Sequence, residues 1–134
     1  MPDPRMKDDP HPELVKKTII PDISSGAHTA SLDVAFYEKK AFPAKYHNGA
    51  FIGQHGSWNR SELSGYKGGG AFDNGKPSGK PEDFLTGFIA DIDKSEVYGR
   101  PVCVAFLADG SMLVTDDVNN TIWRVRADNT TDKQ

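Results

Sequence analysis

The chain has 134 residues, of which 37% are hydrophobic and 26% are charged, the make-up of about one globular domain. A formal net charge of -3 leaves no basic field for binding nucleic acid, and no apolar run is long enough to span a membrane. The first residues also lack the pattern of a signal peptide. Thirteen glycines and nine prolines beside short apolar runs favour strands and turns, so we expect an all-β fold.

The N-terminal part is expected to lie outside the main fold. Four prolines stand among charged residues in the first twelve positions, so residues 1–17 predict an irregular or disordered leader. The β-branched run 15–20 predicts a short edge strand that Pro21 ends. A small-residue loop follows, and its His28 is either a structural surface residue or part of a site.

Strand periodicity begins at residue 31. Leu32, Val34 and Phe36 would share one face of a strand, with the intervening residues on the other face. Residues 42–46 predict an irregular connection with room for one helical turn, and residues 50–53 predict the next strand.

The run 51–61 carries more hydrogen-bonding variety than a connection between strands needs. It holds the imidazole of His55, the indole of Trp58 and the guanidinium of Arg60. Such side chains in a loop indicate a pocket or an interface. The alternative is an ordinary long loop whose tryptophan caps the core and whose arginine pairs with a surface carboxylate. The run itself is compatible with both.

The middle of the chain has the weakest strand signals. Three consecutive glycines at 68–70 predict a weak strand or a loop, and no Lys-Ser or Lys-Thr follows them to form a phosphate-binding loop. Residues 73–79 form a turn cluster, and residues 84–89 are a further candidate strand.

The last third predicts three consecutive antiparallel strands. Residues 101–108 are apolar on both faces, the turn pair Asp109-Gly110 follows, and residues 112–115 and 121–126 complete the meander. The only cysteine, Cys103, lies in the first of these runs. It excludes an internal disulfide, and we expect its thiol to be buried and inert.

Two segments repeat the same triplet, Val-Ala-Phe at 34–36 and again at 104–106, and each opens a strand-turn-strand unit. We therefore predict a partial β-propeller of two antiparallel blades within residues 18–126, followed by a disordered tail, 127–134. Because a closed propeller needs about four to eight blades, the chain cannot close a ring alone.

Several strings of residues, in the same order, resemble the C-terminal part of the L-sorbosone dehydrogenase type of glucose/sorbosone dehydrogenases. The resemblance covers roughly residues 21–125. The matching strings are 26–32, 35–37, 42–43, 51–61, 75–79, 81–84, 99–102, 116–117 and 121–125.

The resemblance implies a six-bladed propeller that binds pyrroloquinoline quinone (PQQ), with calcium, near its axis. It implies a quinoprotein oxidoreductase of carbohydrate metabolism that oxidises aldoses or sorbosone-like sugars at C1. A histidine would take the hydroxyl proton while hydride passes to C5 of the quinone. A periplasmic or secreted location is also implied for the family.

The resemblance assigns cofactor-binding roles to few residues. Arg100 matches an arginine that reaches the cofactor from the loop before a strand, with a salt bridge to Asp91, Asp93 or Glu96 as the alternative. A cofactor-binding lysine of the family falls near Gly56, so Arg60 or His55 would take its role. His28 and Trp58 are expected on the substrate side.

No catalytic residue or metal ligand is assigned, because the general base and the calcium ligands are expected in N-terminal blades. The first hypothesis is therefore a C-terminal fragment that is inactive alone and needs the missing blades. Three copies of a two-blade unit would also complete six blades. The alternative, from another class, is a β-rich binding or interaction module. A metal site on His28, His47 and His55 lacks ligand spacing.

Overall fold

A computed structural model describes residues 5, 8, 11–57, 63–65, 67–68, 72–73, 76–77 and 81–128. Within these residues the chain is almost entirely β, with ten short strands, one α-helix and one 3-10 helix. None of the helices described is long and apolar enough to cross a membrane.

The first sheet contains three antiparallel strands in the order β1-β2-β3. Strand β1 covers Ser31–Phe36, β2 covers Ala50–Gln54, and β3 is reduced to Lys67–Gly68. The short β3 agrees with the weak strand expected near the glycine run. Between β1 and β2 lies the single helical turn predicted there, η2, at Ala44–Tyr46.

The second sheet is the predicted C-terminal meander, in the order β10-β9-β8. Its strands are β8 at Pro101–Phe106, β9 at Met112–Asp116 and β10 at Thr121–Val125. The turn between β8 and β9 is closed by the Asp109 carboxylate, which accepts hydrogen bonds from the Ser111 N–H and hydroxyl at 3.0 and 2.6 Å.

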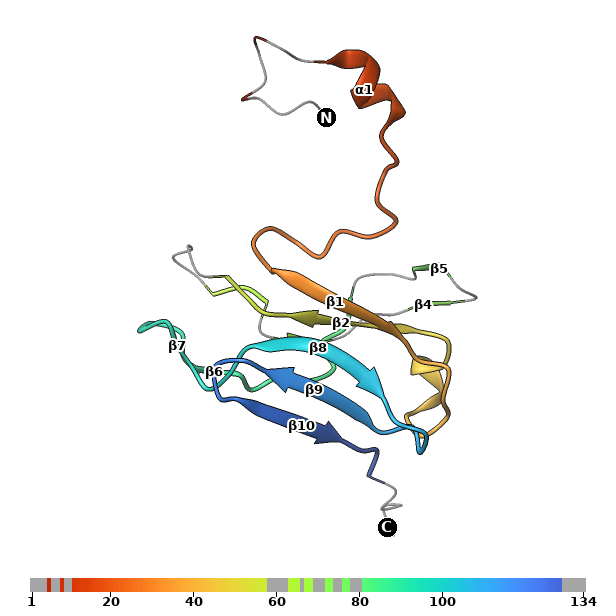
Figure 1. The fold of residues 1–134 in the computed structure, drawn as a ribbon, viewed down its shortest axis with the longest axis vertical. Coiled ribbons are helices and arrows are strands. Elements are labelled where there is room, and N and C mark those ends of the chain that lie inside the picture. Colours follow the sequence, from red (N-terminus) through yellow and green to blue (C-terminus); the bar gives the residue numbers. More distant parts are fainter. Residues whose placement is uncertain are drawn as a thin grey trace.

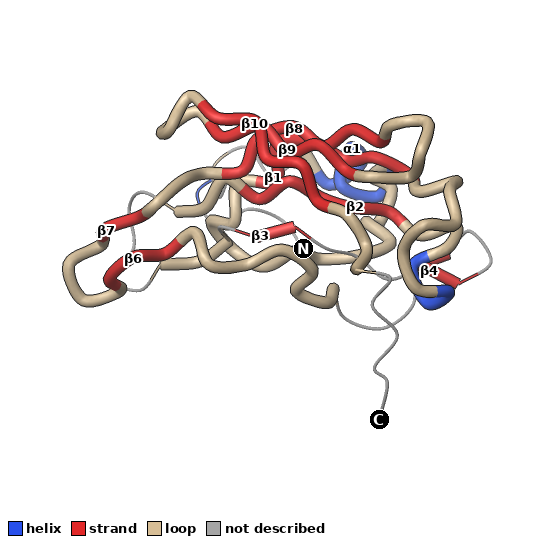
Figure 2. The backbone as a smooth tube through the Cα atoms, turned by 90° about the horizontal axis from the view of Figure 1, so that it is seen from below, coloured by secondary structure: helices blue, strands red, loops and turns tan. Residues whose placement is uncertain are grey.

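The two sheets pack face to face, and their inner faces form the core (Figures 1 and 2). An aromatic cluster fills this core, with the Tyr37 and Phe106 ring centroids 4.8 Å apart and those of Phe51 and Phe84 4.7 Å apart. The buried hydrophobic members of the cluster are Tyr37, Phe42, Phe51, Val104, Met112 and Val114.

The sheets approach closely at one point, where β2 crosses β8. A Cβ atom on Gly53 would lie 2.3 Å from the Val102 carbonyl oxygen, so only glycine allows this approach. Nearby, the Val104 N–H donates to the Asp33 carboxylate on β1 at 2.8 Å. Packing and a charge-assisted hydrogen bond therefore both connect the sheets.

Two small hairpins complete the described strands. Strands β4 (Phe72–Asp73) and β5 (Lys76–Pro77) form one, and β6 (Ile89–Asp91) and β7 (Glu96–Val97) form the other. The strand expected at 84–89 is wrong in its extent, because β6 starts only at Ile89. Gly87, with φ at +94°, lies in a conformation that interrupts an extended strand.

The N-terminal segment contains a helix, α1, at Pro12–Lys17, where an irregular leader and the start of an edge strand were expected. The strand predicted at 15–20 is therefore wrong. Proline at the start and lysines in the last turn suit a helix and its dipole, which the β-branched residues obscured in the sequence. The helix stands apart from the two sheets (Figure 1).

The expected burial of Cys103 is also wrong, since its side chain is exposed. Residues alternate between the faces of β8, and Val104 points into the core while Cys103 points outward. An apolar run indicated burial on both faces, but only one face of this strand is covered. Of the predicted tail, 127–134, the structure describes only residues 127 and 128, and the rest lies outside the described residues.

Candidate functional site

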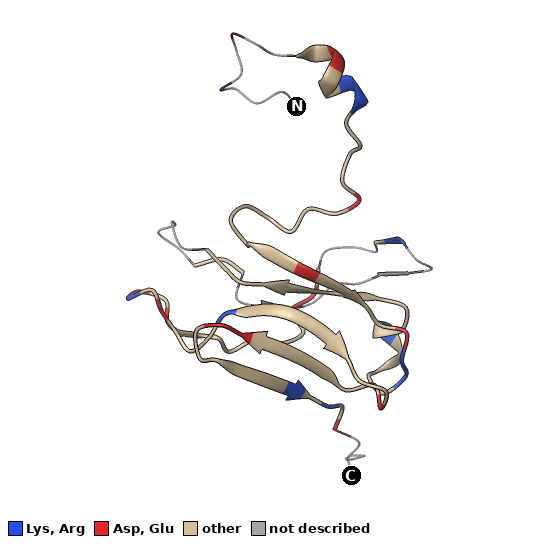
Figure 3. Ribbon diagram, in the orientation of Figure 1, with Lys and Arg blue, Asp and Glu red and all other residues tan. Residues whose placement is uncertain are grey.

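The loops at one edge of the two sheets bring together most of the polar residues singled out in the sequence. Strand β2 ends at this edge, β8 starts there and β9 ends there, because Pro101 pairs with Asp116 and Gly53 lies against Val102 (Figure 1). His55 follows β2, Arg100 precedes β8, and an acidic pair closes β9. Figure 3 shows acidic colouring at the end of β9 and basic colouring just before β8.

His55 is held by a carboxylate from the other sheet. Its Nε2 atom lies 3.1 Å from both carboxylate oxygens of Asp117. Its backbone N–H donates to the Ala30 carbonyl at 3.0 Å, so both the ring and the main chain are fixed. An imidazole oriented in this way leaves Nδ1 to donate or accept one hydrogen bond.

His28 lies on a loop that is bonded to the same edge. The Gly56 N–H donates to the Thr29 carbonyl at 3.0 Å, next to the bond between His55 and Ala30. His28 itself is exposed and has a left-handed backbone, with φ at 58°. The structure therefore places its loop beside His55, and the substrate-side role stays a prediction.

The buried Asp116 carboxylate fixes the loops at this edge through hydrogen bonds. Its buried carboxylate oxygen Oδ1 accepts backbone hydrogen bonds from Arg100 at 3.0 Å, Val118 at 3.1 Å and Asn119 at 3.2 Å. Burial alone would raise the pKa of Asp116, but these bonds and one from the Trp123 indole outweigh it and lower the pKa. The carboxylate therefore stays ionised and holds the loops before β8 and after β9.

Gly99 makes room for this carboxylate, because a Cβ atom there would lie 2.0 Å from Asp116 Oδ2. Arg100 thus extends from a main chain that is fixed on both sides, with its side chain half-buried. Asp91, one candidate partner of Arg100, forms an ion pair with Lys94 at 3.0 Å instead. Trp58 and Arg60 lie outside the described residues.

The roles of Asp116 and Asp117 were not predicted from the sequence. Two adjacent carboxylates at the end of an alternating strand were the available signal, since one of them points inward and the other outward. Burial of a carboxylate requires donors: the Val118 and Asn119 N–H groups are local to Asp116, but the Arg100 N–H and the Trp123 indole come from other segments.

The donors at this edge suit an anionic, planar ligand in part. A guanidinium at position 100 can bind a carboxylate through two hydrogen bonds, and Nδ1 of a protonated His55 can donate one more. The buried Gln54 Oε1 has no hydrogen-bond partner among the described residues, so a further acceptor next to His55 is unsatisfied. The donors therefore fit the carboxylates of a quinone, whereas the Gln54 acceptor does not attract an anion.

A metal site does not emerge from the described part of the chain. No group of three or more His, Cys, Asp or Glu side chains there could hold a metal ion. His47, one member of the imagined three-histidine site, contacts the Phe42 carbonyl at 2.9 Å instead. The location of calcium ligands in other blades stays a prediction.

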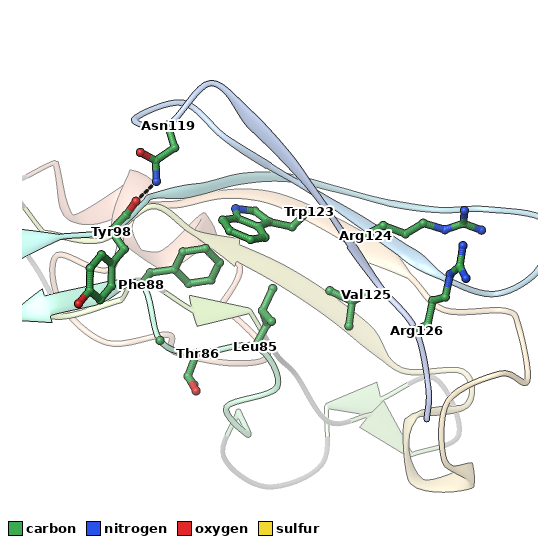
Figure 4. A pocket seen from close by; sticks show the side chains of 10 residues that line it. Leu85, Thr86, Phe88, Tyr98, Asn119, Trp123, Arg124, Val125 and Arg126 are labelled. Carbon is green, nitrogen blue, oxygen red and sulfur yellow. Dashed lines mark hydrogen bonds between the residues drawn. The ribbon is translucent and has the colours of Figure 1, made fainter. Parts of the chain in front are cut away.

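A separate apolar cavity of about 730 Å³ lies between β10 and the segment before β6 (Figure 4). The Phe88 and Trp123 rings meet there edge to face, with centroids 6.4 Å apart. The Trp123 indole N–H donates to Asp116 Oδ2 at 3.2 Å, which fixes the ring. None of the residues predicted from the sequence to form a site lines this cavity.

Comparison with known proteins defines the family. The model of a family described as TrAA12-like matches residues 11–128. The chain belongs to the TrAA12-like family. A Borreliella burgdorferi protein described as uncharacterised is 45% identical over 101 residues, which cover 74% of this chain and 26% of that protein.

Solved structures of TrAA12-like relatives share the fold. The iodide structure of a Trichoderma reesei carbohydrate-active enzyme of family AA12 has a TM-score of 0.61 and 24% identity, covering 76% of this chain and 26% of that chain. The holo form of the pyranose dehydrogenase PQQ domain from Coprinopsis cinerea has a TM-score of 0.57 and 23% identity. The match covers 75% of this chain and 27% of that chain. The all-β, partial-propeller fold class is confirmed.

The fold is shared with a carbohydrate-active enzyme of family AA12 and with a PQQ domain of a pyranose dehydrogenase, and the expected quinone-dependent role of this chain stays a prediction. The sorbosone dehydrogenase type is not distinguished from other members. The chain spans about a quarter of the length of the TrAA12-like relatives it matches.

Proposed function

We propose that the chain supplies one wall of a PQQ site in a sugar oxidoreductase. The observation that supports this most is the convergence of the His55 and Arg100 loops on one edge, fixed by Asp117 and Asp116. The proposed reaction is oxidation of an aldose or sorbosone-like sugar at C1. PQQ, when bound, supplies the redox chemistry by accepting hydride at its C5.

The roles of the residues follow from their chemistry. The Arg100 guanidinium binds a cofactor carboxylate, and its fixed main chain limits the entropy lost on binding. In its protonated form His55 donates a hydrogen bond from Nδ1 to a cofactor oxygen while Asp117 holds Nε2. By resemblance, Arg60 adds a second cation, and His28 and Trp58 lie toward the sugar. None of these residues is proposed as the general base.

The remaining machinery is proposed to lie in further blades. The chain corresponds to 26% of the length of its Trichoderma reesei neighbour, so a complete site needs more β-sheet than is present here. The general base and calcium ligands belong to that part, and the chain alone is proposed to be inactive. A periplasmic or secreted location is proposed from the family.

Calorimetric titration of PQQ, with calcium present, tests the cofactor role of Arg100. We expect weak binding by the unaltered chain and about tenfold weaker binding by Arg100→Ala, which corresponds to about 1.4 kcal/mol. Arg100→Lys should lie between them, because lysine keeps the charge but loses the planar fork. Arg126→Ala, an exposed arginine after β10, is the matched control and should bind as the unaltered chain does.

Equal PQQ affinity of the Arg100→Ala and Arg126→Ala variants would refute the assignment of Arg100. Turnover of sugars by the chain alone, in a panel of aldoses with PQQ and calcium, would refute the proposal that it is inactive by itself. A negative activity test combined with Arg100-dependent PQQ binding is the expected result.

A binding or interaction module is the second candidate function, and one observation favours it. The outer faces of both sheets expose large apolar side chains, among them Phe36 at 61% and Ile122 at 66%. Exposed apolar patches of this kind are typical of interaction surfaces. This alternative would be favoured if PQQ binding were unchanged in the Arg100→Ala variant and the chain formed a stable complex with another protein through these exposed faces.

A further inference from the structure

The apolar cavity beside β10 lies on the inner side of the second sheet. Trp123 and Val125 of β10 pair with Val114 and Met112 of β9, which belong to the core, and cross-strand partners share one face of a sheet. The segment 85–88 lines the opposite side of the cavity (Figure 4). Further blades would pack on the outer faces of the two sheets, so the cavity is not the place that they would occupy.

Aromatic rings form the cavity wall, and their positions are fixed from behind. The Trp123 indole N–H donates to Asp116 Oδ2 at 3.2 Å and its ring meets the buried Phe88 edge to face, yet 44% of the residue is exposed. Tyr98 stands at the rim, where its backbone N–H donates to the Phe88 carbonyl at 2.7 Å (Figure 4). A ligand that stacks on Trp123 therefore meets a ring that is already ordered, which lowers the entropic cost of binding.

Hydrogen-bonding groups surround this apolar wall. Thr86, Tyr98, Asn119 and Arg126 line the cavity and are exposed. The Asn119 side-chain amide donates to the Tyr98 carbonyl, which leaves its Oδ1 to accept, while the Arg126 guanidinium only donates. No Asp or Glu is among the described residues that line the cavity. The rim thus offers both donors and acceptors around an aromatic floor.

A pyranose ring matches this arrangement of groups. Its faces carry C–H groups, whose partial positive charge is attracted to the negative face of an aromatic ring, and its edge carries hydroxyls that need hydrogen-bond partners once water is removed. A wholly apolar ligand would cover the floor and use none of the rim. The cavity volume of about 730 Å³ lies within the roughly 300–1,000 Å³ that is typical of ligand sites.

We propose that this cavity is a second carbohydrate site, which binds a pyranose unit of a neutral sugar chain stacked on Trp123. It goes beyond the proposed quinone site, because binding here needs neither quinone nor calcium. The two sites are adjacent, since the N–H groups of Asn119 and Arg100 donate to the same oxygen of Asp116. The cavity therefore holds a sugar chain next to the Arg100 loop and takes no part in the chemistry.

Calorimetric titration with cellohexaose, xylohexaose, mannohexaose and maltohexaose, without PQQ and calcium, tests this site. At least one of these sugars should bind the unaltered chain. Tyr98→Ala removes an exposed ring at the rim but keeps the backbone bond to Phe88, so binding should weaken about tenfold. Tyr98→Phe keeps the ring and should lose less. Phe36→Ala removes an exposed ring on the outer face of β1 and is the matched control that should bind normally.

Tryptophan fluorescence gives a second, local readout. The bound sugar should change the emission of the unaltered chain, and this change should disappear in Trp123→Phe, although Trp58 remains as the other tryptophan. Trp123→Phe keeps a ring in the wall and loses the bond to Asp116, so circular dichroism should confirm that the variant is folded. Binding by Trp123→Phe should be weaker than binding by the unaltered chain but still measurable.

Three results would overturn the proposal: no binding of any of these sugars, equal affinity of the Tyr98→Ala and Phe36→Ala variants, or a cavity that takes only an apolar dye of the anilinonaphthalene type. The proposed quinone site is tested separately with the same variants. Tyr98→Ala should bind PQQ as the unaltered chain does, and Arg100→Ala should bind the sugar normally. Loss of one binding activity without the other therefore shows which of the two proposals fails.

Discussion

The Val-Ala-Phe triplets of β1 and β8 have the same sequence but opposite environments. Val104 is 6% exposed inside the chain, whereas Val34, at the equivalent place of the first triplet, is 54% exposed. Burial here is thus decided by whether another blade lies on that face, because the local pattern is the same on both strands. The same comparison separates Asp116, which is buried, from Asp117, which is exposed.

The largest expected effect is a difference in the free energy of unfolding between substitutions of Asp116 and of Asp117. Asp116→Ala removes the acceptor of three backbone N–H groups and one indole N–H, so we expect a loss of about 4 kcal/mol in the free energy of unfolding. Asp117→Ala, the outward-facing control, should lose less than about 1 kcal/mol. Urea unfolding of both variants measures the difference, and equal losses would contradict the role of Asp116.

The same carboxylate predicts an acid dependence. Its pKa is lower in the folded chain than in the unfolded chain, so its contribution is complete above the ordinary aspartate pKa of 3.8. The contribution is lost as the pH falls through the lowered folded value. Asp116→Asn should therefore show a flatter decline of stability below about pH 4 than the unaltered chain.

The next effect tests the close approach of the sheets. Gly53→Ala would place a methyl group 2.3 Å from the Val102 carbonyl oxygen, so the sheets must separate, and we expect a loss of about 3 kcal/mol. Gly87→Ala meets nothing within 4 Å and should cost about 1 kcal/mol for its positive φ alone. Thermal unfolding compares the two variants. Similar losses would mean that the sheets do not touch at Gly53.

A matched pair of valines tests the inner and outer faces directly. Val104→Ala opens a cavity in the core and should cost about 2 kcal/mol, whereas Val34→Ala should cost less than about 0.5 kcal/mol in a single chain. Both measurements belong at protein concentrations where the chain is not associated. A larger loss at Val34 than at Val104 would reverse the assignment of the faces.

The smallest effect concerns the turn between β8 and β9. Hydrogen bonds from the Ser111 hydroxyl and N–H, with the nearby Arg124, lower the pKa of Asp109 to about 2. Its contribution to stability is therefore present above the ordinary pKa of 3.8 and is lost as the pH falls through about 2. Asp109→Asn should remove this part of the acid dependence and slightly lower the stability at pH 7, where the ionised carboxylate contributes, with a small effect because the side chain is exposed. Thermal unfolding of both proteins between pH 2 and pH 7 tests this.

The sequence predicted the strands whose pattern and turns agree. Alternation from residue 31 gave β1, and Asp109-Gly110 between two apolar runs gave β8 and β9. The sequence did not predict burial where burial depends on whether another segment covers the residue. Cys103 sits in an apolar run yet is exposed, because no described segment covers its face.

The candidate site was predictable only in part, because some of its contacts join segments that are distant in the sequence. His55 and Arg100 were recognised from a distinctive loop and a resemblance, and strand order brings their loops to one edge. The role of Asp116 was not predicted, because besides the local N–H groups of Val118 and Asn119 it depends on the Arg100 N–H, which approaches it only in the folded chain.

The reactivity of cysteine thiols tests the central distinction between covered and uncovered faces most directly. In the dilute, folded chain Cys103 should react with a thiol reagent nearly as fast as a free cysteine does. A cysteine placed at position 104 in a Cys103→Ala background should react only when the chain unfolds, since that side chain is in the core. A protected Cys103 together with a reactive cysteine at 104 in dilute native buffer would contradict this arrangement of the two blades.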